Sequence, residues 1–166
     1  MLKIYLAGPD VFETDAIEQG KRLKKFCLQY GFKGLFPLDN EIADGGTPYE
    51  TAKTIREANI KLIERCDIVM ANLNTFRGLE PDSGTVYEVG YAAALGKEVY
   101  AYASDLRPML ERVREKQMLS EDAGLCQEGK IIEDFGLSHN LMMLDLIVAD
   151  NAEKCLAYIS KQKRDA

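Results

Sequence analysis

One short segment constrains the fold more than any other part of the chain. Residues 67–73 read Asp-Ile-Val-Met-Ala-Asn-Leu and are apolar on both faces of an extended strand, which is typical of a strand buried inside a parallel sheet. Further strands are predicted at residues 2–7, 35–38 and 98–102. The helices predicted between and after these strands span residues 13–30, 48–65, 84–95 and 105–118, and the C-terminal part is also expected to be helical.

Strands that alternate with helices at this spacing indicate a single domain over residues 1–166, with an α/β fold of the flavodoxin or Rossmann type. We expect a mainly parallel, five-stranded sheet flanked by helices. Ligands of such sheets bind at the carboxyl ends of the strands, which here lead into residues 8–12, 39–41 and 74–82. The functional site is therefore expected at that edge of the sheet.

Two helix starts carry recognisable signals. Thr47 and Glu50 can form a capping box around Pro48, which stands at the first helical position. Asp150 and Glu153 have the spacing of a second capping box. Both signals predict that a helix begins directly after the first residue of the pair.

The charge and the histidine content narrow the function. The chain has 21 Lys and Arg against 27 Asp and Glu, a formal net charge of −6, which argues against general nucleic-acid binding. The single histidine, His139, excludes a site with several histidine ligands and points to acid–base chemistry carried out by carboxylates. We interpret His139 as a loop or interface residue and the charged residues 107–116 as the solvated face of a helix.

Composition also bears on location and metal binding. No apolar run approaches the roughly 20 residues that a membrane helix needs, and the opening residues do not resemble a secretion signal. The four cysteines, at positions 27, 66, 126 and 155, are spaced too widely to predict a zinc site. We therefore expect reduced thiols, a cytoplasmic location, no membrane partner and no metal site.

The helix predicted at residues 84–95 holds the most informative side chain. Glu88 is the only charged residue within residues 83–96, a segment whose apolar character predicts a helix buried on most sides. A buried carboxylate is costly unless it is paired, hydrogen-bonded or protonated. Glu88 is then either a structural residue satisfied by a tyrosine or an amide, or a functional one.

A second carboxylate lies close to Glu88 in the sequence. Asp82, six residues earlier, has the simple alternative role of a helix N-cap. A capping Asp and a Glu in the second turn nevertheless lie close enough to flank one small ligand. Two carboxylates that flank a glycosidic bond carry out retaining hydrolysis or transfer.

Other residues near the predicted edge are ambiguous on their own. Tyr5, in the first strand, is either a core residue or directs its hydroxyl at a carboxylate. Asp10 and Phe12 follow in the loop at the carboxyl edge, and Gly84 fits a close approach of a ligand to the backbone.

Taken together, four segments of the sequence resemble the nucleoside 2-deoxyribosyltransferase family. The longest, residues 76–97, contains Pro-Asp-Ser-Gly-Thr-Val-Tyr-Glu-Val-Gly-Tyr-Ala and is specific. The other three are residues 3–12, 36–40 and 138–143, which are weaker but occur where the family has them. The four segments span most of the chain in the right order.

The resemblance implies a role for each candidate residue. Glu88 would be the nucleophile that attacks the anomeric carbon of a 2′-deoxynucleoside, and Tyr5 would orient its carboxylate. Asp82 would contact the nucleobase and help to protonate it, while Phe12 would pack on the base. Asn140 would reach the sugar site of a neighbouring subunit, which implies a homo-oligomer.

Two positions depart from patterns seen in the family. Asn59 stands where members that act on both purines and pyrimidines often have an aspartate, and an amide cannot give up a proton. Glu41 stands where some members have a glutamine. We expect Asn59, Glu41, Asp10 and Gly84 to contribute to substrate binding, with Asn59 leaving the preference between purine and pyrimidine bases open.

The implied reaction is a double displacement between 2′-deoxynucleosides and free purine or pyrimidine bases. It passes through a deoxyribosyl ester on Glu88, which water hydrolyses slowly when no acceptor base is present. The reaction needs no metal ion or organic cofactor. Two alternatives remain open. One is an N-glycosidase for 2′-deoxynucleoside 5′-monophosphates, with Arg77 and Ser83 available for the phosphate, and the other is a non-catalytic nucleotide-binding module.

Overall fold

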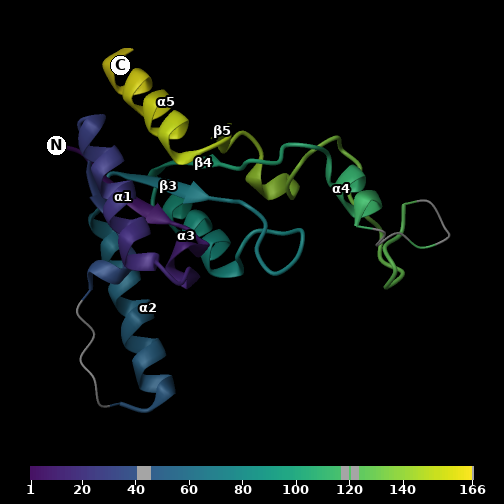
Figure 1. The fold of residues 1–166 in the computed structure, drawn as a ribbon, viewed down its shortest axis with the longest axis horizontal. Helices are drawn as coiled ribbons and strands as arrows, with labels where there is room; N and C mark the ends of the chain where they lie inside the picture. The colour runs from purple at the N-terminus through teal and green to yellow at the C-terminus, as the bar shows by residue number, and fades with distance from the viewer. Residues whose placement is uncertain (41–45, 117–119, 121–123, 166) are drawn as a thin grey trace.

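The computed structural model of the chain describes residues 1–40, 46–116, 120 and 124–165. In this part of the chain, five strands form one parallel sheet in the order β2-β1-β3-β4-β5 (Figure 1). The strands are β1 (Lys3–Ala7), β2 (Lys33–Leu35), β3 (Ile68–Asn72), β4 (Glu98–Tyr102) and β5 (Ile147–Ala149). The helices are α1 (Ala16–Gln29), α2 (Pro48–Arg65), α3 (Ser83–Ala94), α4 (Met109–Glu115) and α5 (Ala152–Asp165). The predicted α/β fold with a five-stranded parallel sheet is confirmed.

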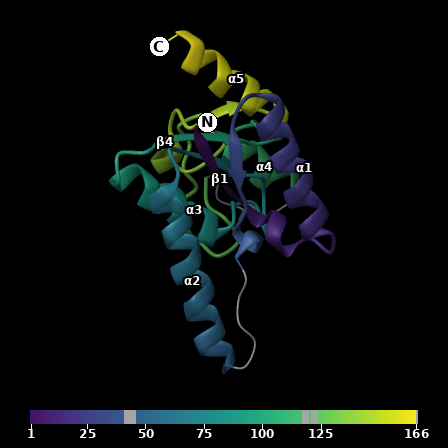
Figure 2. The ribbon, with the colours of Figure 1, turned by 90° about the vertical axis from the view of Figure 1, so that its left-hand side faces the viewer.

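Helices cover both faces of the sheet, as a parallel sheet requires. Along β1, Ile4 and Leu6 pack in the cluster that contains residues of α1 and α5, whereas Tyr5 and Ala7 pack in the cluster that contains residues of α2 and α3. Figure 2 shows α1 on one side of the sheet and α2 and α3 on the other. All five residues of β3 are buried between these layers, which explains the doubly apolar run in the sequence.

The carboxyl ends of the parallel strands meet at one edge of the sheet. The chain leaves β1 there through Gly8, close to the end of β3. A Cβ atom added at Gly8 would lie 2.7 Å from the Cβ of Asn72, which is closer than carbon atoms approach in proteins. Only glycine therefore lets the two strand ends lie so close together at this edge.

A long excursion separates β4 from β5. Residues 105–116 and 124–144, named the arm here, leave the sheet and return to it at β5, and Figure 1 shows α4 far from the sheet. Large apolar side chains on the arm are exposed, with exposed fractions of 86% for Ile131 and 78% for Met142. Most of the arm lies beyond the layers that cover the sheet.

The structure corrects three predicted boundaries. The second strand occupies residues 33–35 rather than 35–38, because Pro37 begins a short 3-10 turn and a proline cannot donate to a strand ladder. The helix predicted at residues 105–118 begins only at Met109 and its described part ends at Glu115. The C-terminal part is not helical throughout, since the three-residue strand β5 precedes α5 and is too short to show a periodic pattern.

The two predicted capping boxes have different outcomes. The first is confirmed: Thr47 Oγ1 accepts from the Glu50 N–H at 3.3 Å, and Glu50 Oε2 accepts from the Thr47 N–H at 2.8 Å. The second is wrong by one residue. Asn151, not Asp150, accepts the hydrogen bond from the Lys154 N–H, at 3.0 Å.

The apolar helix α3 is less buried than its sequence predicts. One face, with Thr85, Val89 and Ala92, packs on the sheet. The opposite face exposes 51% of Tyr87 and 45% of the flanking Leu95. In the described residues, no helix has the length and hydropathy needed to cross a membrane.

Candidate active site

Tyr5 and Glu88, which are 83 residues apart in the sequence, meet between the sheet and α3. The Tyr5 hydroxyl donates a hydrogen bond to Glu88 Oε1 at 2.6 Å. Tyr5 is fully buried because β1 is an inner strand, between β2 and β3. Both alternatives considered for Tyr5 therefore apply together, since its ring is part of the core and its hydroxyl contacts the carboxylate.

Burial controls the protonation of this pair. It raises the pKa of Glu88 to about 7, and the nearby charge of Asp82 acts in the same direction. The hydrogen bond from Tyr5 opposes this rise by stabilising the ionised carboxylate. Burial and the negative Glu88 together raise the pKa of Tyr5 well above its ordinary value, so that Tyr5 remains a hydrogen-bond donor.

Asp82 is the N-cap of α3, as predicted. Its Oδ2 accepts from the Thr85 N–H at 2.8 Å and from the Thr85 hydroxyl at 2.9 Å. A Cβ atom at position 84 would lie 3.0 Å from the same Oδ2, so Gly84 leaves room around the carboxylate. The capping role and a functional role are compatible, because capping uses only one of the two carboxylate oxygens.

A cavity of about 450 Å³ lies between α2 and α3 and has Glu88 in its wall. This volume is in the range of small-molecule sites. Two further predicted residues, Asn59 and Gly84, also line it, and the Asn59 Oδ1 is a buried oxygen with no hydrogen-bond partner in the described residues. The full lining consists of Ala52, Ile55, Arg56, Asn59, Ile60, Gly84, Tyr87 and Glu88.

Several predicted residues are not in this lining: Tyr5 and Asp82, and also Asp10 and Phe12 of the loop after β1. Phe12 is 57% exposed and stacks on Phe76, with 5.1 Å between ring centroids and the Arg77 guanidinium over both rings. Asp10 accepts a hydrogen bond from Asn72 Nδ2 at 2.9 Å and lines a different cavity, which residues of α1 and α5 border.

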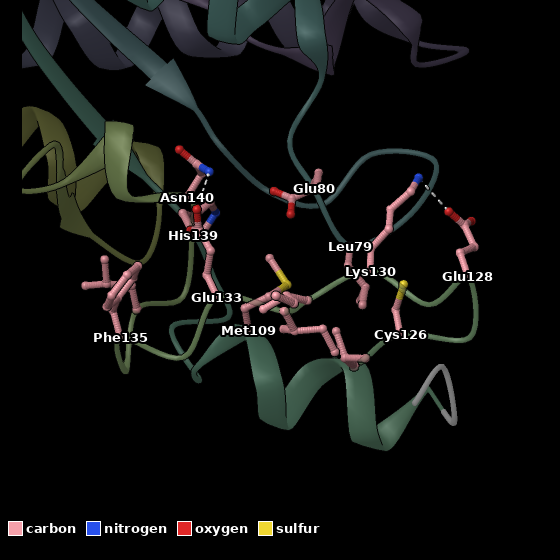
Figure 3. Close-up of a pocket in the computed structure, with 14 residues that line it drawn as sticks. Leu79, Glu80, Met109, Cys126, Glu128, Lys130, Glu133, Phe135, His139 and Asn140 are labelled. Atoms are coloured by element: carbon pink, nitrogen blue, oxygen red, sulfur yellow. Dashed lines mark hydrogen bonds and ion pairs between the residues drawn. The ribbon is translucent and has the colours of Figure 1, made fainter. Parts of the chain in front are cut away.

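Asn140 also lies outside the lining of the Glu88 cavity of its own chain. It borders a mostly apolar cavity of about 480 Å³ in the arm, where Figure 3 shows its side chain directed at Glu133. Asn140 Nδ2 donates to Glu133 Oε1 at 3.1 Å, and Asn140 Oδ1 accepts from the Met142 N–H at 3.0 Å. Glu41 falls outside the described residues.

Sequence reasoning missed some residues around these cavities. Arg56 and Tyr87 line the Glu88 cavity. Arg56 lies three residues before Asn59, and Tyr87 is next to Glu88. This proximity in the sequence is the signal that could have identified them as site residues. The interpretation of residues 107–116 as a solvated helix face is wrong at one position, because Arg112 is only 2% exposed.

The arrangement suits chemistry at a carboxylate. A glutamate with a pKa near neutrality, held by a tyrosine hydroxyl, faces an apolar cavity sized for a small organic molecule. In the described residues, no group of three or more His, Cys, Asp or Glu side chains is placed to hold a metal ion. Glu88, oriented by Tyr5, can carry out nucleophilic attack or proton transfer on a molecule in the cavity.

Comparisons with known proteins agree on one family. The family model for nucleoside 2-deoxyribosyltransferase matches residues 4–142. A solved structure of a 2-deoxyribosyltransferase from Leishmania mexicana is 39% identical, with 97% of this chain and 98% of that chain covered and a TM-score of 0.79.

Two further matches add a shared fold and a relative that this chain covers only in part. The 2-deoxyribosyltransferase from Bacillus psychrosaccharolyticus is 20% identical over 92% of this chain and 88% of its own, with a TM-score of 0.58, and shows a shared fold. An uncharacterized protein from Schizosaccharomyces pombe is 39% identical over 117 residues, which are 67% of this chain. The match spans about half, 54%, of that relative's length.

Proposed function

The chain belongs to the nucleoside 2-deoxyribosyltransferase family, and on that premise we propose that it transfers the 2-deoxyribosyl group between nucleobases through a covalent intermediate on Glu88. The hydrogen bond from Tyr5 to Glu88 beside the cavity between α2 and α3 is the observation that carries the proposal. It joins a partly buried nucleophile, a group that orients it and a space for substrate.

In the first half of the reaction, Glu88 attacks C1′ of a 2′-deoxynucleoside. Tyr5 holds Oε1, which leaves Oε2 to form the ester bond. The C1′–N bond breaks, its electron pair goes to the base, and the base takes a proton from Asp82 or from a water that Asp82 holds. The transition state resembles an oxocarbenium ion, which the negative charge of the carboxylate stabilises.

In the second half, another base attacks C1′ and displaces Glu88 with net retention of configuration. When no base is present, water attacks instead and hydrolyses the ester slowly. Ribonucleosides are expected to react poorly, because the electron-withdrawing 2′-hydroxyl destabilises the cation-like transition state.

The substrate pocket is proposed to be completed by a second subunit. Asn140 does not line the Glu88 cavity of its own chain, and the arm that carries it exposes Ile131 and Met142 to water. An exposed apolar surface of this kind is typical of a protein–protein interface. We expect a homo-oligomer in which Asn140 reaches the sugar site of a neighbour, and sedimentation of the intact protein as a monomer would contradict this.

One observation favours a second candidate function. Arg56 lines the same cavity as Glu88, and a guanidinium there can bind a phosphate group. The second candidate is therefore hydrolysis of 2′-deoxynucleoside 5′-monophosphates to free base, with the same nucleophile.

A single experiment separates these functions. The protein is incubated with 2′-deoxyinosine and either adenine or cytosine, and in parallel with 2′-deoxynucleoside 5′-monophosphates, and products are separated by chromatography. Formation of 2′-deoxyadenosine or 2′-deoxycytidine supports the transferase. Release of base only from the monophosphates supports the second candidate and contradicts the first. Binding without turnover contradicts both and leaves a non-catalytic module.

A further inference from the structure

Arg112, on α4 of the arm, is a buried charge without an ion-pair partner. It is 2% exposed, and no carboxylate of the described residues forms an ion pair with it. Buried charges are costly and are normally paired. The positive charge of Arg112 must therefore be offset by other groups, and their identity indicates what the side chain does.

Backbone carbonyls from two separate segments take this role. Arg112 Nη1 donates to the Leu79 carbonyl at 3.2 Å, and Arg112 Nη2 donates to the Ser138 carbonyl. Leu79 lies three residues before Asp82, and Ser138 lies two residues before Asn140. One guanidinium thus joins the loop that leads to Asp82 and the segment that carries Asn140.

His139 ties the same two segments together at a second point. Its Nε2 lies 2.8 Å from the Leu73 carbonyl oxygen, which only accepts, so Nε2 carries the ring proton. Its Nδ1 lies 2.9 Å from Ser138 Oγ and accepts from that hydroxyl. Burial lowers the pKa of His139, which keeps the ring neutral in this arrangement.

The loop held by Arg112 is closed by its own hydrogen bond. The Phe76 N–H donates to the Glu80 carbonyl at 2.9 Å, and Arg77 between them has a positive φ of 53°. Leu79 lies in this turn, three residues before Asp82. We expect a displacement of the Leu79 carbonyl to shift the short stretch of chain that leads to Asp82.

We propose that Arg112 is a positioning residue, which fixes the place of Asp82 against the leaving base and the place of Asn140 in the arm. A methionine would fill the same space without burying a charge, but it would leave the Leu79 and Ser138 carbonyls without a donor. Packing alone does not account for an arginine here. The proposal rests on the proposed function, in which Asp82 serves the site of its own chain and Asn140 that of a neighbour.

The test uses Arg112→Met, Arg112→Lys and the control Arg114→Met, which changes an exposed arginine of the same helix. Turnover is measured with 2′-deoxyuridine and 5-fluoro-2′-deoxyuridine, whose base leaves with less need of protonation. With Asp82 misplaced, Arg112→Met lowers kcat/KM for 2′-deoxyuridine by roughly 10- to 100-fold and for the fluorinated substrate by much less. Arg112→Lys keeps a charged donor group that can reach one of the two carbonyls, and it shows the same pattern with a smaller loss. Arg114→Met is expected to resemble the unmodified protein.

Amide hydrogen exchange of the intact protein provides a readout that does not depend on activity. Arg112→Met, or Arg112→Lys if the former does not fold, is expected to speed exchange in residues 73–82 and 137–141 but not in β1 and β3. Equal losses for both substrates, or unchanged exchange in both segments, would overturn the proposal. Absence of turnover in the unmodified protein would refute the proposed function instead, and the exchange experiment would still decide whether Arg112 couples the two segments.

Discussion

Glu88 and Arg112 are side chains of opposite charge, set among apolar groups in two different regions of the molecule. Glu88, in the cavity between α2 and α3, is held by one tyrosine hydroxyl and borders a space that a ligand can enter. Arg112, in the arm, is held by two backbone carbonyls that do not titrate. A partly buried charge next to an open cavity is available for chemistry, whereas a buried charge bonded to backbone carbonyls of two segments is suited to holding those segments together.

The largest expected effect comes from removing the reactive member of this pair. Glu88→Ala is expected to abolish deoxyribosyl exchange, with a loss of at least about a thousandfold in kcat, because no other group takes the place of a covalent nucleophile. Exchange between 2′-deoxyinosine and adenine is measured by chromatography. The circular dichroism spectrum serves as the folding control, and a folded variant with more than a few per cent of the activity would refute the assignment.

Tyr5→Phe removes the hydrogen bond but leaves the carboxylate in place. Because that bond lowers the pKa of Glu88, the pKa rises above its present value of about 7 and the carboxylate ionises only at higher pH. The pH profile of kcat/KM, which increases as Glu88 loses its proton, should shift upward by about one pH unit. Activity at pH 7 should fall roughly fivefold and recover in large part at pH 9. An unshifted profile would show that Tyr5 does not act through Glu88.

A second carboxylate in the same cavity should change which bases are accepted. Asn59→Asp replaces an amide, which offers both a donor and an acceptor, by a group that only accepts when ionised. We expect the ratio of adenine to cytosine transfer to change by roughly tenfold. Asn59→Ala, which keeps the position uncharged, is the matched control, and equal ratios in Asn59→Asp and the unmodified protein would exclude Asn59 from base selection.

The contributions of Glu88 and Arg112 to the free energy of unfolding should depend differently on pH. The raised pKa of Glu88 means that the folded state holds its proton more tightly than the unfolded state. Ionised Glu88 therefore lowers stability increasingly from about pH 4.5 upward, with the full effect above about pH 7. Glu88→Gln should raise the free energy of unfolding by about 1–3 kcal/mol at pH 8.5 and by less at pH 5.5.

Arg112→Met should instead lower the free energy of unfolding by about 1–3 kcal/mol at both pH values, because two partly buried carbonyls lose their donors. Urea denaturation of both variants at pH 5.5 and 8.5 measures the contrast. A Glu88→Gln variant that is less stable than the unmodified protein at pH 8.5 would contradict the burial effect on Glu88.

Much of the sheet region could be predicted from the sequence, because local patterns there agree with the fold. The doubly apolar run of β3 reflects burial on both faces, which the structure confirms, and the apolar character of α3 reflects the burial of its inner face. The sequence offers the hydrogen bond between Tyr5 and Glu88 only as one alternative. Its formation depends on the pairing of β1 with β3 and on the packing of α3 against both strands.

The arm was harder to predict, because its important contacts join segments that are distant in the sequence. Nothing in the charged run around Arg112 distinguishes it from the exposed Arg114, and only the approach of the Leu79 and Ser138 carbonyls sets them apart. His139, a loop residue in the sequence-based interpretation, is buried and hydrogen-bonded to the Leu73 carbonyl, 66 residues earlier. Side chains that bond to distant backbone leave no periodic signal.

The most direct test of the account is to trap the intermediate. The protein is mixed briefly with a 2′-deoxynucleoside without an acceptor base, denatured, digested and measured by mass spectrometry. We predict that the peptide containing Glu88 gains the mass of one deoxyribosyl group, and that this gain disappears in Glu88→Gln and when an acceptor base is added first. A protein that turns over substrate without this adduct, or that carries it on another residue, would contradict Glu88 as the nucleophile.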